Sequence, residues 1–431
     1  MRLLAPILAL LILAGCVSGG RSSDSLDRIA ADYVRMTLEI GEREPGYVDA
    51  YYGPAEWQAA AKAAPRALPE LAAAAAVLSA RTTTIDPSRL DLMERRRREF
   101  LLAQLRAAQT RLRMLRGQKL SFTEEAQGLF GVRVDLKPLA SYDALLTRLQ
   151  RLVPGTGSLA ERVDAFQDRF TIPKERLGLV FDAAIAECRR RTAQRIALPA
   201  GEAFTMEFVT GKSWSGYNYY QGNLKSLIQI NTDLPIRISR AVDLGCHEGY
   251  PGHHALNMLL EQRLTKKRGW IEFSVYPLYS PQSLIAEGSA NYGIDLAFPG
   301  PERLGYESAA LYPLAGLSTR DAEKNLALIE ATRGLQGARF TIARDYLEGR
   351  IDRAQAIELT QKYQLVSRKR AEQLIDFTQQ YRSYVINYGL GQDMVQAYVE
   401  AAGSTPQARW AAMERILSEP TLPSDLLVRA R

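Results

Sequence analysis

The chain has 431 residues, of which 55 are Lys or Arg and 48 are Asp or Glu, so its formal net charge is +7. Hydrophobic residues make up 46% and charged residues 24%, which are ordinary globular values and exclude a wholly disordered chain. Three cysteines are too few for a disulfide scaffold. All three histidines fall within residues 247–254, and this cluster is the most informative feature of the composition.

Residues 1–15 are predicted to be a signal peptide, because a basic start precedes twelve apolar residues, 3–14. This run is shorter than the roughly 20 residues that cross a membrane. Its end, Leu13-Ala14-Gly15-Cys16, resembles the bacterial lipoprotein box, which implies a lipid on Cys16. The alternative is a plain signal peptide followed by a coincidental cysteine.

The residue after Cys16 is Val17, not the Asp that retains lipoproteins at the inner membrane. In a Gram-negative cell the resemblance therefore implies an outer-membrane lipoprotein that faces the periplasm. Residues 16–23 would form the lipidated cysteine and a flexible tether, because they are rich in Gly and Ser.

Residues 24–200 are predicted to form a helical N-terminal region, since apolar residues recur there at three- and four-residue steps. Asp86-Pro87-Ser88 is expected to open a long helix that runs to Leu115. This helix carries a basic run at 94–99 with almost no aromatic residues beside it, which is typical of a solvated helix face. We therefore expect no nucleic-acid partner.

Residues 201–431 differ in pattern and are predicted to contain strands at about 204–231, followed by helices from about residue 305. The fold class expected is mainly α, with a small β-sheet beside the histidine motif. We expect residues 226–231 to form an edge strand that pairs with an extended peptide.

The histidine cluster differs from the familiar zinc motif His-Glu-x-x-His, because Pro251 stands where the second His would be. Proline disrupts a helix, and Gly252 adds backbone freedom, so a kink or bulge is expected there. If the kink absorbs two residues, His253 joins His247 as a metal ligand. His254 is then left behind the ligands or facing the substrate, although the choice between His253 and His254 stays open.

The motif His247-Glu-x-x-Pro-Gly-His253, followed by Glu287-Gly288, resembles the bacterial domain-of-unknown-function family 885, whose members are similar in plan to gluzincin zinc peptidases. The resemblance implies a large helical peptidase-like fold, a metallopeptidase region with its metal motif at 247–292, and one Zn²⁺. Glu287 would be the third ligand and Glu248 the general base. Asn291, one helical turn after Glu287, would hold a ligand histidine in place.

The chain has no histidine after His254, so the donor that stabilises the oxyanion must be a Tyr or an Arg. Tyr384 and Tyr388 are the candidates, because their spacing places them on one face of a helix. The alternative interpretation is that both are core aromatics.

The sequence therefore predicts a zinc metallohydrolase, most simply a peptidase with a peptide substrate and a lipid anchor. Two alternatives remain: a zinc hydrolase of esters or non-peptide amides, and a non-catalytic metal-binding lipoprotein scaffold. The sequence leaves the peptide length, exopeptidase against endopeptidase action and the oligomeric state open.

Overall fold

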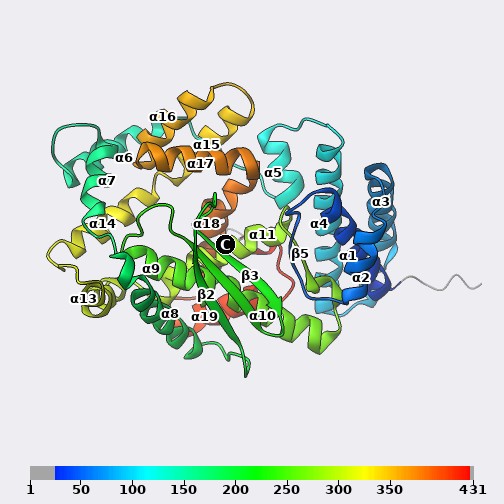
Figure 1. The fold of residues 1–431 in the computed structure, drawn as a ribbon. Coiled ribbons are helices and arrows are strands. Elements are labelled where there is room, and N and C mark those ends of the chain that lie inside the picture. The colour runs from blue at the N-terminus through cyan, green and yellow to red at the C-terminus, as the bar shows by residue number, and fades with distance from the viewer. Residues whose placement is uncertain (1–24, 428–431) are drawn as a thin grey trace, which may run out of the picture.

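A computed structural model describes residues 25–427 of the protein, and the predicted signal peptide, Cys16 and the tether lie outside this range. The described chain is mainly helical with a small sheet, which confirms the predicted fold class (Figure 1). None of the helices within 25–427 combines the length and the apolar character needed to cross a bilayer.

The N-terminal helices lie together at one end of the molecule, coloured blue to cyan in Figure 1. They are α1 (Leu26–Arg43), α2 (Ala55–Ala63), α3 (Leu68–Thr84), α4 (Leu92–Leu115) and α5 (Phe122–Phe130). Helix α4 begins later than predicted, since Pro87–Arg89 forms a separate 3₁₀ turn. The Asp91 side chain accepts from the Glu94 amide, and Glu94 in turn accepts from the Asp91 amide, so this capping box sets the start.

The remaining helices lie beside and behind the sheet, and most of them make up the other end of the molecule (Figure 1). They are α6 (Asp143–Leu152), α7 (Leu159–Asp168), α8 (Leu177–Ala193), α9 (Ser239–Leu244), α10 (His253–Leu260), α11 (Pro281–Ala297), α12 (Glu302–Tyr306), α13 (Tyr312–Ala315), α14 (Ala322–Arg333), α15 (Gln336–Leu347), α16 (Arg353–Gln364), α17 (Arg368–Tyr381), α18 (Ile386–Ala401) and α19 (Pro406–Ser418).

Helices α11 and α18 pack closely because two glycines meet between them. A Cβ added to Gly288 would lie 2.4 Å from the carbonyl carbon of Gly391, closer than any side chain tolerates. This contact brings Glu287 on α11 near the segment that carries Tyr384 and Tyr388.

Three strands form the main sheet, near the predicted positions: β2 (Ala203–Val209), β3 (Gly216–Gly222) and β4 (Lys225–Asn231). Their order is β2-β4-β3, with β2 parallel and β3 antiparallel to β4. The expectation that 226–231 is an edge strand is therefore wrong, because β4 pairs on both sides. Strand β3 is instead an edge strand of this sheet.

A short strand, β1 (Val48–Tyr51), lies in the region predicted to be helical and pairs antiparallel with β5 (Val275–Pro277). This pairing joins the N-terminal helices to the part of the chain that carries the histidines. One cluster of buried apolar side chains runs through both predicted regions, so the two regions share a core.

Candidate metal centre

The histidine motif spans two separate helical segments. Helix α9 continues into a π-helical turn, Gly245–Gly249, which carries His247 and Glu248. Tyr250 is extended, with φ −130° and ψ 122°, and α10 then starts at His253. The kink predicted at Pro251 is thus a complete break in the helix, and a new helix with the second histidine starts after it.

Gly252 makes this break possible. Its amide donates to the carbonyl oxygen of Cys246 over 3.0 Å. A Cβ at this position would lie 1.8 Å from the carbonyl oxygen of His247. Only glycine fits there, and its place in the sequence therefore fixes how closely His253 approaches His247.

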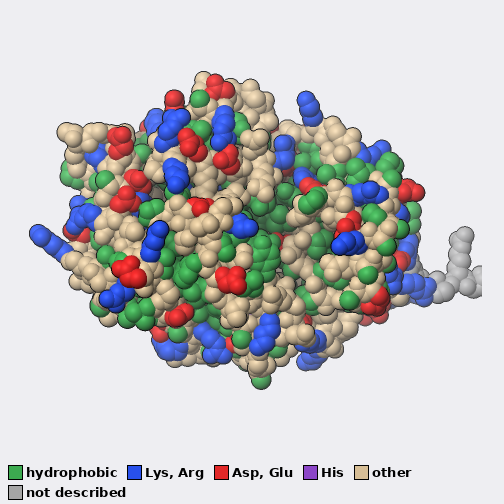
Figure 2. Space-filling model, viewed as in Figure 1, with side chains coloured by type: hydrophobic (Ala, Val, Ile, Leu, Met, Phe, Trp, Pro, Cys, Tyr) green, Lys and Arg blue, Asp and Glu red, His purple; other side chains and the backbone are tan. Residues whose placement is uncertain are grey.

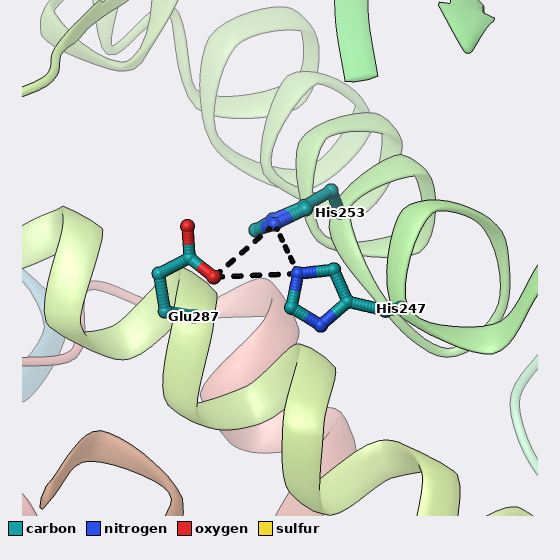
Figure 3. Close-up of side chains that lie close together, drawn as sticks. All are labelled: His247, His253 and Glu287. Atoms are coloured by element: carbon teal, nitrogen blue, oxygen red, sulfur yellow. Dashed lines mark hydrogen bonds and ion pairs between the residues drawn. The ribbon is translucent and has the colours of Figure 1, made fainter. Parts of the chain in front are cut away.

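The three predicted ligand side chains meet at one point (Figure 3). The Nε2 atoms of His247 and His253 are 3.1 Å apart, and Glu287 Oε2 lies 3.3 Å from the first and 3.8 Å from the second. Each residue offers one ligand atom, and all three atoms lie within 4.8 Å of one another. The cluster contains His253 and not His254, and it could hold a metal ion.

The hydrogen bonds around the cluster turn the Nε2 atom of His247 and the Oε2 atom of Glu287 toward its centre. Asn291 donates from Nδ2 to the carbonyl oxygen of Tyr388, so its Oδ1 faces His247 Nδ1 at 3.0 Å. The Nδ1 atom of His247 must then carry the proton, which leaves a lone pair on Nε2. Glu287 Oε2 is buried and has no hydrogen-bond partner within residues 25–427. Two imidazole nitrogens and a carboxylate oxygen that converge in this way fit a divalent cation.

Electrostatics favour the same conclusion. Burial lowers the pKa of His253 to about 4, so this imidazole stays neutral, the form that binds metal. Burial also opposes charge on His247, but Glu287 and Glu248 outweigh it and raise the pKa of His247 above its ordinary value. The negative field that raises this pKa also favours a bound cation.

Glu248 lies beside the cluster but is not one of its three ligands. It lines the cleft and is 3% exposed, and burial, the largest influence, raises its pKa to about 7. Strand β3 packs directly on it: a Cβ on Gly216 would lie 2.6 Å from Glu248 Oε1, and Asn218 Nδ2 donates to the Glu248 carbonyl oxygen over 2.8 Å. Neither β3 residue was identified from the sequence, because nothing in a strand pattern marks its contact with a distant turn.

The hydroxyl groups of the two predicted tyrosines have different surroundings. Tyr384 donates its hydroxyl to Glu287 Oε1 over 2.8 Å, which holds the carboxylate with its other oxygen toward the histidines. The hydroxyl of Tyr388 has no hydrogen bond within the described residues, and this residue lines the cleft. Burial and then Glu287 raise both pKa values well above the ordinary value, so both phenols keep their protons.

His254 points away from the cluster. It is 0% exposed, its Nδ1 lies 2.8 Å from Ser226 Oγ, and its Nε2 lies 3.1 Å from Glu202 Oε2. Both ring nitrogens are therefore occupied beneath the sheet, and the expectation that His254 faces substrate or supports a ligand is wrong. The physical reason is that adjacent residues at the start of α10 point in different directions, about 100° apart.

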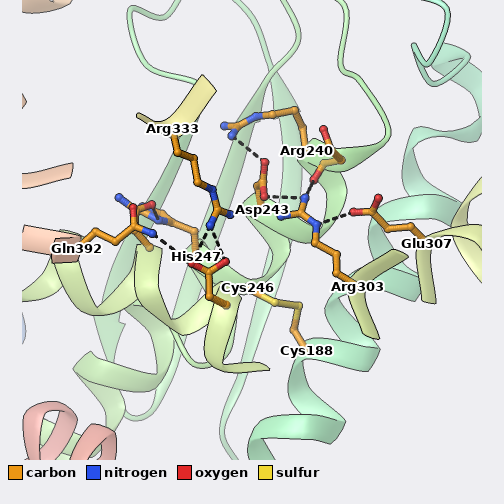
Figure 4. Close-up of polar contacts among 12 residues, drawn as sticks. Cys188, Arg240, Asp243, Cys246, His247, Arg303, Glu307, Arg333 and Gln392 are labelled. Atoms are coloured by element: carbon orange, nitrogen blue, oxygen red, sulfur yellow. Dashed lines mark hydrogen bonds and ion pairs between the residues drawn. A yellow bond between two sulfur atoms is a disulfide. The ribbon is translucent and has the colours of Figure 1, made fainter. Parts of the chain in front are cut away.

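A disulfide and a buried ion-pair network hold the turn that carries His247 and Glu248, called the metal turn below (Figure 4). Cys188 on α8 is bonded to Cys246, the residue before His247, with a Cα–Cα distance of 5.4 Å. Arg303 donates to Glu307 over 2.8 Å and lies 2.9 Å from Asp243, one turn before His247.

Removal of the disulfide in a Cys188→Ala, Cys246→Ala double variant is expected to lower the free energy of unfolding by up to about 4 kcal/mol, because the bond closes a loop of 58 residues in the unfolded chain. Urea denaturation of the two proteins measures the difference. Equal midpoints with unchanged slopes would show that the bond contributes no stability.

The cluster opens into a cleft with a volume of about 860 Å³. Its walls include residues within 44–49, Arg111 of α4, the edge strand β3 and helices α15 and α17. Figure 2 shows this face hollowed near its centre, with positive and negative side chains interspersed around the hollow.

Comparison with known proteins gives weak matches. No family model matches the chain, and no curated protein matches it. Among solved structures, a candidate lipoprotein from Colwellia psychrerythraea has a TM-score of 0.48 at 16% identity, over 80% of this chain and 66% of its own, so the chain spans just under two thirds of it. The M32 carboxypeptidase from Deinococcus radiodurans R1 has a TM-score of 0.35 at 15% identity, over 90% of this chain and 88% of its own. At these values neither match carries an argument about function.

Proposed function

We propose that the protein is a zinc-dependent hydrolase that cleaves peptide bonds. The observation that carries the proposal is the set of three potential ligand atoms, from His247, His253 and Glu287, within 4.8 Å of one another. A buried carboxylate that is not a ligand, Glu248, lies beside them in the cleft. Two imidazoles and one carboxylate are a ligand set typical of catalytic zinc, which keeps one position for water.

When bound, the ion lowers the pKa of a coordinated water to about 7 and polarises the substrate carbonyl. Glu248 accepts the proton of the attacking water and delivers it to the leaving amine. Gly216 leaves room for the Glu248 carboxylate, and Asn218 fixes the backbone that carries it. Asn291 keeps His247 in the tautomer that binds metal.

Tyr388 is the better of the two predicted oxyanion donors. Its hydroxyl is free among the described residues, whereas the hydroxyl of Tyr384 is engaged by Glu287. Because both phenols stay protonated, Tyr388 donates a hydrogen bond to the oxygen that becomes negative in the transition state. Tyr384 positions the ligand carboxylate instead.

The edge strand β3 supports a peptide as the substrate. Residues 216–219 of β3 line the cleft beside Glu248, and an edge strand offers backbone donors and acceptors that pair with an extended chain. We propose for β3 the peptide-pairing role that the sequence suggested for 226–231. Strand β3 would thus pair with the backbone of the substrate, and the neighbouring Glu248 would act as the base.

We also propose membership of family 885 and a place in the cell envelope, anchored through Cys16 at the outer membrane and facing the periplasm. The Cys188–Cys246 disulfide supports an oxidising compartment of this kind. The lipoprotein box itself supports the anchor.

A chelator experiment tests the proposed function against its alternatives. Peptide hydrolysis is expected to disappear on dialysis against EDTA and to return with added Zn²⁺, because three described side chains contribute the metal site. A panel of matched peptides and esters then distinguishes the hydrolases. Activity that survives metal removal contradicts the metal mechanism, ester cleavage alone favours an esterase, and bound zinc without any hydrolysis favours a scaffold.

A further inference from the structure

Three arginines from three helices gather in the cleft near the metal centre. Arg240 lies on α9, Arg339 on α15 and Arg370 on α17, and all three line the cleft and are half-buried. Burial first, and then the positive charges of Arg240 and Arg339, lower the pKa of Arg370 to about 10. Arg370 thus lies in one cleft with two other positive charges that act on it.

Two of these charges lack a carboxylate partner. Arg339 has no hydrogen bond or ion pair within residues 25–427, and its Nε is buried without a partner. Arg370 donates only to neutral oxygens, 2.6 Å to Gln373 Oε1 and 2.8 Å to Ser215 Oγ. Arg240 lies 3.3 Å from Asp243.

Other arginines that line the cleft are neutralised by the protein. Arg333 lies 2.8 Å from the Asp295 carboxylate, and Arg111 donates to both oxygens of Glu44. Unpaired charge in a half-buried position is costly, and a bound anion offsets that cost. Arg339 and Arg370, which no carboxylate of residues 25–427 pairs with, thus mark a position where an anion would be stabilised.

This position lies close to the reacting centre. The Arg339 guanidinium carbon is 5.7 Å from the ring centroid of Tyr388, and Glu287 is near enough to act on its charge. Ser215, which holds Arg370, precedes Gly216, the residue packed on Glu248. An anionic group held here belongs to a substrate residue at or next to the cleaved bond.

We propose that Arg339 and Arg370 bind the C-terminal carboxylate of a peptide, so that the enzyme acts on the C-terminal end of its substrates. The inference rests on the proposed peptidase function. A guanidinium matches a carboxylate with two parallel hydrogen bonds, and two arginines together discriminate strongly against an uncharged amide.

Binding to the zinc-loaded Glu248→Gln protein tests the proposal without hydrolysis. Calorimetry compares acetyl-trialanine with its C-terminal amide, and the acid is expected to bind about 10- to 100-fold more tightly. Arg339→Gln or Arg370→Gln, added to this background, is expected to remove most of the preference. Arg333→Gln is the matched control, because Asp295 already holds that charge, and it should keep the preference.

Equal affinities for acid and amide would overturn the proposal, and this comparison needs no arginine variant to fold. A preference kept in both arginine variants would overturn the residue assignment. An amidated peptide with an internal Glu that binds as tightly as the acid would identify a side-chain carboxylate and overturn the terminal one. Wild-type protein that prefers acids but cleaves no peptide contradicts only the proposed function, whereas a peptidase without acid preference contradicts only this inference.

Discussion

Glu248→Gln is expected to lower kcat for peptide hydrolysis by about 10²- to 10⁴-fold, the usual contribution of a general base. Glutamine keeps the shape of the side chain but cannot accept the proton of the attacking water. Zinc should stay bound, because the three ligand atoms belong to His247, His253 and Glu287. Steady-state kinetics together with zinc content per chain measure both parts of the result.

The control is the same substitution at a glutamate outside the cleft. Glu207 lies exposed on the outer strand β2, where it accepts from Gln229 over 3.3 Å, and it does not line the cleft. Glu207→Gln should therefore leave kcat unchanged. Peptidase activity retained in Glu248→Gln would contradict the mechanism. Loss of zinc from that variant would indicate that Glu248 is a metal ligand.

The candidate metal centre could be predicted from the sequence because its information is local. His247, Glu248 and His253 lie within seven residues. Pro251 and Gly252 indicate that the helix is interrupted before His253. Glu287 lies 34 residues after His253 and was assigned through the family resemblance, with Asn291 one helical turn after it. What the sequence could not supply is the size of the break, because Tyr250 adopts its extended conformation only where Gly252 contacts the preceding turn.

Features that depend on distant pairing escaped prediction. Strand β4 reads as a strand in sequence, but its place in the centre of the sheet depends on β2 returning parallel to it. The disulfide joins residues 58 apart in sequence, and its thiols meet only because α8 packs against the metal turn. The helical content was predictable because the spacing of apolar residues is itself local.

His253 and His254 are adjacent in sequence but have different surroundings, and this makes them a natural pair for mutation. His253 Nε2 lies 3.1 Å from His247 Nε2 in the cluster. His254 lies in a buried pocket where it contacts Ser226 and Glu202. Burial raises the pKa of the Glu202 carboxyl, but His254, Tyr250 and Arg189 outweigh it and lower this pKa to about 2.

His253→Ala is expected to abolish peptide hydrolysis and to weaken zinc binding by more than the roughly 10- to 100-fold that loss of a ligand's hydrogen-bond partner costs. His254→Ala should keep zinc but lower the free energy of unfolding by about 1–3 kcal/mol, since Glu202 loses one buried partner and keeps Tyr250 and Arg189. Competition with a chromogenic chelator and urea denaturation measure the two effects. If His254→Ala instead lost the metal while His253→Ala retained it, the ligand assignment would be reversed. Opposite outcomes from neighbouring residues would show that the break at Pro251 and Gly252, and not the number of histidines, determines which imidazole reaches the metal.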